Sequence, residues 1–287
     1  MLKQRVITAV VLLAILLPAM FYKTPAPFCA VALVLIAAGT WEWARLNGYS
    51  PAVSILVGFC MAVLCALAWY AGLLTKPLPL LWILAGGLWV LLGAKLLRRG
   101  VPGWPVIPKV LRLLGGMAML WLAWLAVAQA RVMGIGFLLS VLLLVWVADI
   151  AAYAAGRTLG GKFTRGKLAP AISPGKSWEG VWGAMVGVVA LSICWALLER
   201  NLTGSGSAMP SSSLYTQLWA QHGVVVMLVG VIFLVAMSVV GDLVESLIKR
   251  SAGVKDSSAL LPGHGGVLDR IDALLPAVPL AMMLVNL

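Results

Sequence analysis

The sequence predicts an all-α polytopic integral membrane protein of about nine transmembrane helices with a cytoplasmic N-terminus. Of the 287 residues, 62% are hydrophobic, only 10% are charged, and the mean hydropathy is +1.04. A soluble domain carries about 25% charged residues. So few charges cannot cover a surface that faces water, so lipid must surround most of this chain. Long apolar runs that recur along the sequence lead to the same fold class.

A membrane-spanning helix needs about 20 mostly apolar residues. Eight such stretches lie at 6–22, 26–40, 51–74, 78–97, 113–130, 134–154, 179–198 and 223–241. A ninth run, 273–287, has 15 residues and contains Pro276 and Pro279. In the seventh stretch, Gly183 and Gly187 form a GxxxG pattern. This pattern favours close helix packing, and a dimer contact is the alternative.

The distribution of Lys and Arg orients these spans. The N-terminus and the even-numbered connections together hold 17 of the 21 basic residues, and the odd-numbered connections hold four. Cytoplasmic loops of membrane proteins accumulate Lys and Arg and meet anionic lipid there. We therefore expect the N-terminus and the sixth and eighth connections in the cytoplasm. The same rule explains the net charge of +12 without nucleic-acid binding.

Carboxylates are scarce and clustered. Five of the nine fall within 242–272, at or beside membrane spans, where an acid is costly unless it is paired or binds a metal. The residues at helical spacing on the polar face of the eighth span are Asp242, Glu245, Ser246, Lys249 and Arg250. A loop with four glycines then leads to Asp269, Arg270 and Asp272. We expect this segment to fold back and face Asp242 with Asp269.

Two converging carboxylates with basic neighbours predict a Mg²⁺ and phosphate site. Carboxylate oxygens hold Mg²⁺, which bridges phosphate oxygens, while Lys and Arg neutralise the remaining charge. The predicted phosphate ligands are Lys249, Arg250, Lys255 and Arg270. The sequence has no cluster of Cys and His residues of the kind that binds zinc, which argues against a zinc site. The alternative is a topological basic loop with internally paired charges, which does not explain the glycines beside His264.

The sixth connection is a second glycine-rich basic segment, which follows Asp149. Its glycines and Lys162, and then Ser173 to Ser177, resemble a nucleotide-phosphate cradle, although the spacing is not that of a Walker A motif. Ser177 is also suited to cap the seventh helix, and the two interpretations are compatible. The contribution of Asp149 stays open.

A known family resembles this chain at these segments. The stretch from Ser246 through Lys255-Asp256 to Pro262-Gly-His264-Gly265-Gly266-Val-Leu-Asp269-Arg270-Ile-Asp272 is similar to the full signature of the phosphatidate cytidylyltransferase (CDP-diacylglycerol synthase) family. The upstream ISPGKSWEG also resembles a family element, although Gly175 and Ser177 stand at positions that vary or take Thr.

The resemblance implies an enzyme that condenses CTP with phosphatidic acid and releases pyrophosphate, with Mg²⁺ and often K⁺ required. The family's paired metal-binding aspartates fall on Asp242 and Asp269. It also implies a homodimer with a funnel open to cytoplasm and lipid, in the bacterial inner (plasma) membrane. We expect residues 1–112 to be a scaffold and residues 113–287 to be catalytic, with cytoplasmic loops at 155–178 and 249–270.

The remaining roles follow from this chemistry. A phosphomonoester is largely dianionic at neutral pH, so the reaction needs charge neutralisation and positioning rather than a strong base. Asp256 and Asp272 are expected to bind the metal directly or to support its ligands. His264 either donates to the leaving pyrophosphate or holds the turn. The expected nucleotide-binding residues are Lys162, Ser173, Lys176, Gly265 and Gly266.

Two rival classes fit less well. Carboxylates within a membrane also mark ion-coupled transporters, which tend to have duplicated halves with acids near mid-membrane. This chain has no matching half, and its acids accompany a basic glycine-rich loop. The DG…AR…G…D…D pattern of CDP-alcohol phosphotransferases does not occur. A kinase that uses CTP on a lipid alcohol is a further, more distant alternative.

Overall fold

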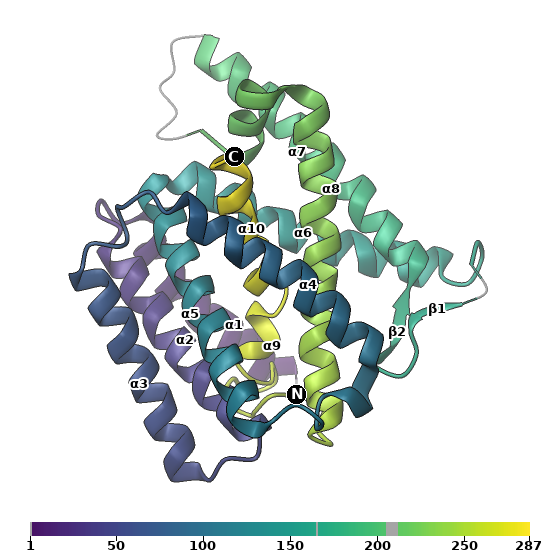
Figure 1. Cartoon of the computed structure of the whole chain (residues 1–287). Coiled ribbons are helices and arrows are strands. Elements are labelled where there is room, and N and C mark those ends of the chain that lie inside the picture. Colours follow the sequence, from purple (N-terminus) through teal and green to yellow (C-terminus); the bar gives the residue numbers. More distant parts are fainter. Residues whose placement is uncertain (1, 165, 205–211) are drawn as a thin grey trace.

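The structure is a computed structural model that describes residues 2–164, 166–204 and 212–287. Within these ranges, eight helices are long and apolar enough to cross a membrane, and they form an irregular bundle (Figure 1). They are α1 (Leu2–Phe21), α2 (Ala26–Leu46), α3 (Pro51–Tyr70), α4 (Pro79–Gly103), α5 (Lys109–Met133), α6 (Ile135–Leu159), α7 (Trp178–Gly204) and α8 (Leu214–Ser251). The eight predicted spans are therefore confirmed as helices.

Helix starts and breaks follow local sequence chemistry. Pro51 and Pro79 occupy first-turn positions, where no backbone N–H is needed. The Ser213 hydroxyl accepts a hydrogen bond from the N–H of Thr216 at 3.2 Å and caps α8. Gly223 has a φ of 86° and interrupts α8 near the predicted start of the eighth span.

The ninth predicted run forms a shorter element. After the single turn α9 (Leu268–Ile271), the chain ends in α10 (Leu274–Val285), which has 12 residues. At 1.5 Å per residue such a helix is about 18 Å long, which is less than the hydrocarbon core of about 30 Å. Ala277 and Leu280 are fully buried, and α10 packs against α4, α5 and α8. It is therefore a core helix, which length alone did not distinguish from a span.

The connection between α6 and α7 contains a small β-hairpin that the sequence analysis did not anticipate. Strand β1 (Lys167–Ala169) pairs antiparallel with β2 (Ser173–Ser177). Ile172 in its turn is buried in a cluster with Trp104, Leu243 and Leu247. The hairpin, which projects from the side of the bundle in Figure 1, is thus fixed against α8.

Glycines allow α7 to approach α6 closely. A Cβ on Gly183 would lie 2.2 Å from the Cβ of Ala155, and a Cβ on Gly187 would lie 2.8 Å from that of Ala151. The GxxxG pattern therefore serves helix packing inside the chain, as the sequence favoured. This close packing brings the end of α6 and the start of α7 together around a polar cavity.

Candidate active site

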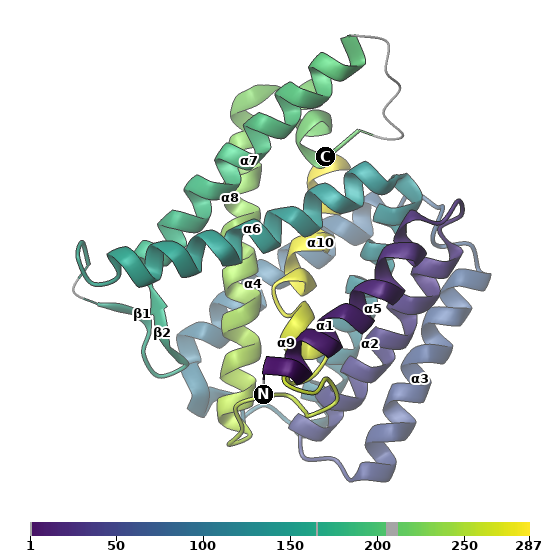
Figure 2. The same cartoon turned by 180° about the vertical axis from the view of Figure 1, so that it is seen from behind.

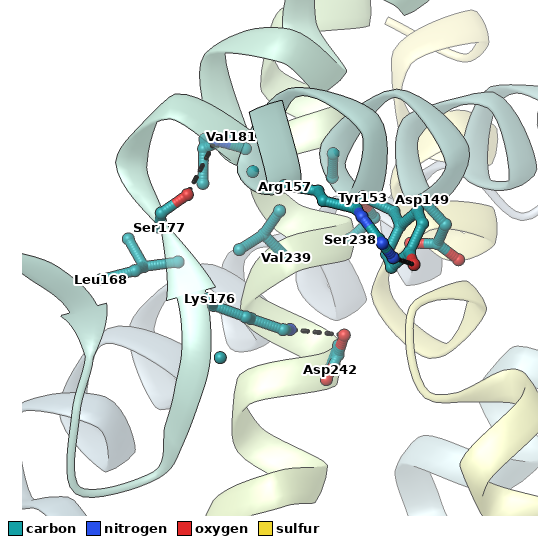
Figure 3. A pocket seen from close by; sticks show the side chains of 14 residues that line it. Asp149, Tyr153, Arg157, Leu168, Lys176, Ser177, Val181, Ser238, Val239 and Asp242 are labelled. Atoms are coloured by element: carbon teal, nitrogen blue, oxygen red, sulfur yellow. Dashed lines mark hydrogen bonds and ion pairs between the residues drawn. The ribbon is translucent and has the colours of Figure 1, made fainter. Parts of the chain in front are cut away.

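A polar cavity of about 390 Å³ lies among α6, α7, α8 and the hairpin (Figure 3). Asp149, Tyr153 and Arg157 enter it from successive turns of α6, while Asp242 enters from α8. Lys176 enters from β2. The structure therefore unites the two segments that the sequence singled out, the glycine-rich sixth connection and the start of the acidic cluster.

Asp242 is the carboxylate at which these segments meet. Its Oδ2 forms an ion pair with Nζ of Lys176, and its Oδ1 accepts a hydrogen bond from the Ser246 hydroxyl at 3.3 Å. Electrostatic interactions also link Asp242 to Asp149 and Asp272. Asp149 and Asp242 are the two carboxylates that line the cavity, and Lys176 is the cationic partner of Asp242.

The turn that follows α6 is organised by Glu179. This buried side chain accepts hydrogen bonds at Oε1 from the N–H groups of Gly161, Phe163 and Thr164, at 2.9–3.2 Å. Ser177 caps α7 by accepting from the N–H of Gly180 at 3.2 Å, which confirms the capping interpretation. The backbone amides of this turn therefore bind a carboxylate of the chain itself.

Lys162 and Ser173 occupy different places in this segment. The side chain of Lys162 is exposed on the turn organised by Glu179. Ser173 begins β2 and is in register with Ala169 of β1. Of the predicted nucleotide-binding residues in this segment, Lys176 is the one that lines the cavity.

Asp269 is the centre of the second cluster. Its Oδ1 lies 2.5 Å from Nζ of Lys249, which lies equally close to Oε2 of Glu245. Its Oδ2 accepts hydrogen bonds from the N–H groups of Ser257 and Gly266 at 2.9 and 2.7 Å. The loop and the end of α8 are therefore joined through one carboxylate.

The two aspartates near α9 have opposite pKa shifts. Burial raises the pKa of Asp269, but hydrogen bonds from Lys249 and from the N–H groups of Gly266 and Ser257 outweigh it, and the pKa falls below its usual range. For Asp272, burial and then the charge of Asp242 raise the pKa. Hydrogen bonds therefore favour the charged form of Asp269, while the charge of Asp242 disfavours the charged form of Asp272.

Gly265 and Gly266 are required by the close packing of this loop. Gly265 has a φ of 81°, and a Cβ there would lie 2.6 Å from Oδ2 of Asp269. A Cβ on Gly266 would lie 2.1 Å from Oγ of Ser257 and 2.3 Å from Oε1 of Glu42. The loop backbone therefore lies close to carboxylates of the chain itself, and nucleotide binding by Gly265 and Gly266 stays a prediction.

Glu42 holds the signature loop, a structural role that the sequence analysis did not assign to it. It lies in α2, is fully buried, and accepts hydrogen bonds from the N–H groups of Val267 and Leu268 at 2.9 and 2.8 Å. The hydroxyl of Ser258 donates to it at 2.5 Å, and that of Ser257 lies 3.1 Å away. An acid within an apolar span was the available signal, but its partners lie more than 200 residues along the chain.

The other predicted residues lie around this loop. Lys255 and Asp256 are exposed. Arg250 donates to the carbonyls of Ile172 and Val254 at 3.4 and 3.3 Å, which ties the end of α8 to the hairpin.

His264 and Arg270 form one unit at the turn. Nε and Nη2 of Arg270 both donate to the His264 carbonyl, at 3.0 and 2.7 Å. Among the described residues, Nδ1 of His264 is buried and has no hydrogen-bond partner. The contact supports a structural role of the turn and leaves the His264 ring nitrogen open to a ligand.

The predicted metal pair consists of two carboxylates that each hold a different lysine. Asp242 pairs with Lys176, and Asp269 pairs with Lys249. Within the described ranges, no three His, Cys, Asp or Glu side chains converge as a ready-made metal site. A metal ion at these aspartates would therefore need further ligands, such as substrate phosphate oxygens or water.

Comparison with known proteins identifies the family. The sequence profile of the cytidylyltransferase family matches residues 3–287. The chain belongs to this family. It is 37% identical to a phosphatidate cytidylyltransferase of Pseudomonas aeruginosa, over 97% of this chain and 95% of the relative. It is 38% identical to a phosphatidate cytidylyltransferase of Haemophilus influenzae, over 97% and 96%.

Membership in the cytidylyltransferase family confirms the resemblance drawn from the signature at 246–272 and its fold expectation of a multi-pass membrane protein. It also bears on the clusters around Asp242 and Asp269, because a cytidylyltransferase must bind the negatively charged phosphates of CTP. Lys176 and Lys249 are two cations that the structure places beside carboxylates.

Proposed function

We propose that this chain is a phosphatidate cytidylyltransferase, which converts CTP and phosphatidate to CDP-diacylglycerol and pyrophosphate. The observation that carries this proposal is the polar cavity beside α8, where Lys176 and Asp242 from the two signature segments meet. The names of the relatives, which match nearly the whole chain, supply the substrates. Such an enzyme must bring a lipid phosphate and a nucleotide together at the membrane.

The reaction depends more on neutralising the negative charge of the substrate phosphates than on proton transfer. A phosphate oxygen of phosphatidate forms a bond to the α-phosphorus of CTP, and the bond from that phosphorus to the bridging β-phosphate oxygen breaks. The attacking phosphate is already largely dianionic at neutral pH. We assign Lys176, Lys249, Arg250, Lys255 and Arg270 to phosphate binding, where they lower the repulsion between the two substrates.

The carboxylates fit a divalent cation. Asp242 lies within electrostatic reach of Asp149 and Asp272, and this repulsion is relieved when a cation is present. Asp242 and Asp269 would hold Mg²⁺ after Lys176 and Lys249 turn from them to substrate phosphates, with K⁺ as a second cation. Bound there, Mg²⁺ supplies neutralisation of phosphate charge and of the pyrophosphate leaving group.

The direct test uses the purified full chain in detergent with radiolabelled CTP, phosphatidate and Mg²⁺. We expect label to enter the lipid phase together with stoichiometric pyrophosphate release. Asp242→Asn should lower kcat by at least about a hundredfold, because charge stabilisation in the transition state is lost. The absence of both products in the unmodified protein would overturn the proposed function, and near-normal turnover in the variant would overturn the assignment of Asp242.

The surroundings of the enzyme are part of the proposal. The concentration of Lys and Arg in the N-terminus and even-numbered connections supports a cytoplasmic N-terminus and a cavity that faces the cytoplasm. The bacterial inner membrane is the expected location, because CTP is available on its cytoplasmic side. A homodimer is the expected assembly, and light scattering of the detergent-purified protein tests it.

A further inference from the structure

A second cavity, of about 320 Å³, lies beside the signature loop and is almost entirely apolar. Its walls come from α1, α2, α5, α6 and the segment 261–275. Among the described residues that line it, Arg270 is the single charged one. A cavity of this kind takes an apolar ligand with an anionic end.

The cavity is accessible from the side of the bundle that faces lipid. Leu13 and Leu17 of α1 and Trp146 of α6 line it, and their side chains remain 48%, 41% and 44% exposed. These residues belong to helices long and apolar enough to span the membrane, so their exposed surface contacts acyl chains. A lipid chain can therefore reach this cavity laterally, without leaving the hydrocarbon region.

Arg270 of the apolar cavity lies near the polar cavity. Its charge is within Coulombic range of Asp149, which lines the polar cavity. On α6, Asp149 lies one turn after Trp146, which lines the apolar cavity. Because Nε and Nη2 of Arg270 hold the His264 carbonyl, Nη1 is the guanidinium nitrogen left for another acceptor.

Helix α1 forms a wall of the cavity and also contacts the signature turn (Figure 2). The Thr8 hydroxyl donates to the Pro262 carbonyl at 2.9 Å. A Cβ on Gly263 would lie 3.3 Å from the backbone nitrogen of Arg5. The packing of α1 against this turn fixes the cavity wall relative to Arg270.

We propose that this cavity binds one acyl chain of phosphatidate while Arg270 binds its phosphate, which directs that phosphate toward the polar cavity. The inference rests on the proposed function and adds the place of the lipid substrate to it. The occupant is a diacyl phosphate rather than a neutral lipid, because Arg270 lies at the one polar point of an otherwise apolar lining.

Cavity-filling variants test the proposal through chain length. Ala32→Leu on α2 and Val127→Phe on α5 place extra carbons in the cavity and leave Arg270 unchanged. We expect each to raise KM for dioleoyl phosphatidate by about tenfold, since ground-state and transition-state binding of the chain are both lost. KM for CTP and for dihexanoyl phosphatidate, whose short chains do not fill the cavity, should change by less than about twofold.

Gly115→Leu is the matched control. Gly115 lines a different apolar cavity, bounded by Trp89 and Trp104, and an added Cβ there meets no atom within 4 Å. We expect this variant to behave as the unmodified chain with both substrates. Equal effects on long and short chains, no effect in either test variant, or the same selectivity in Gly115→Leu would each overturn the proposal.

A binding measurement separates this inference from the proposed activity. Phosphatidate with a photoactivatable acyl chain, irradiated with the full chain in detergent, should label peptides of α1, α2 or α5, or the part of α6 around Leu142 and Trp146. Excess unlabelled phosphatidate should reduce this labelling, and phosphatidylcholine should not. Labelling confined to other helices, or equal competition by both lipids, would overturn the acyl-chain site even if the enzyme is active, whereas an inactive chain contradicts the proposed function instead.

Discussion

Buried carboxylates determine how the signature loop is held. Glu42 and Asp269 together accept hydrogen bonds from the N–H groups of Ser257, Gly266, Val267 and Leu268. The Ser257 hydroxyl lies within reach of both acids, although its single proton can serve only one of them at a time. The loop therefore has little freedom, because each unpaired buried donor would cost about 1–3 kcal/mol.

The first prediction concerns Glu42→Gln. The amide NH₂ would face donors and not acceptors, so we expect the loop to shift and kcat to fall at least about tenfold, with KM for CTP changed less. Glu42→Asp, which retains the charge, should recover part of kcat. Arg45→Gln on the exposed part of the same helix is the control. Steady-state kinetics that show equal activity for Glu42→Gln and Arg45→Gln would contradict the positioning role.

The second prediction concerns Lys249, which lies 2.5 Å from both Glu245 and Asp269. Lys249→Met leaves two largely buried carboxylates without their cation, so we expect a loss of about 3 kcal/mol in the free energy of unfolding. Adding Glu245→Gln removes one of the charges and should restore part of that loss. Lys255→Met, at an exposed lysine, should have little effect. Thermal unfolding in detergent measures all three, and a double variant less stable than Lys249→Met would refute the account.

At the scale of elements, the α6–α7 pair forms one wall of the polar cavity. Small residues allow the two helices to approach closely, as the overlap of a Cβ on Gly183 with Ala155 demonstrates. The hairpin β1–β2 then leaves this pair and delivers Lys176 to Asp242 on α8. The position of Lys176 therefore depends on helix packing near the end of α6 and the start of α7.

The third prediction tests that dependence. Gly183→Leu should push α7 away from α6, lower the free energy of unfolding by about 1–3 kcal/mol and reduce activity. Gly87→Leu is the matched control for Gly183→Leu. Gly87 also lies inside a long helix, but a Cβ added there has no atom within 4 Å. We expect this control to stay within about 1 kcal/mol of the unmodified chain. Equal melting temperatures for the two variants would show that the close approach is dispensable.

At the scale of the whole molecule, the features that depend on residues close together in the sequence were predictable, and those that depend on contacts between distant segments were not. The eight spans were predictable because each depends on its own run of apolar residues. The short helix α10 was predicted as a span because length alone does not distinguish a 15-residue apolar run that spans the membrane from one that forms a buried core helix. The hairpin was missed because glycine, proline and lysine in a short segment resemble a loop.

The candidate site likewise has a part that could be predicted from the sequence and a part that could not. The cluster at 242–272 was predictable because helical spacing and the signature lie within one segment. Two other contacts depend on segments that meet only in the folded bundle. They are the ion pair of Asp242 with Lys176 and the hydrogen bonds that Glu42 accepts from the loop. No local sequence pattern indicates such contacts. The structure pairs Asp242 with Lys176 and Asp269 with Lys249, and the expected joint metal site of Asp242 and Asp269 stays a prediction.

The orientation of the bundle is the last prediction, and it follows from charge. Tyr70 at the end of α3 is 94% exposed beside the third connection, which holds Lys76 as its one basic residue. Val106, 75% exposed, lies in the fourth connection, which the basic residues assign to the cytoplasm. In a chain whose four native cysteines are replaced, a membrane-impermeant maleimide should label Tyr70→Cys in intact spheroplasts. It should label Val106→Cys only in inverted vesicles. The reverse pattern would place the polar cavity on the side without CTP and would contradict the proposed topology.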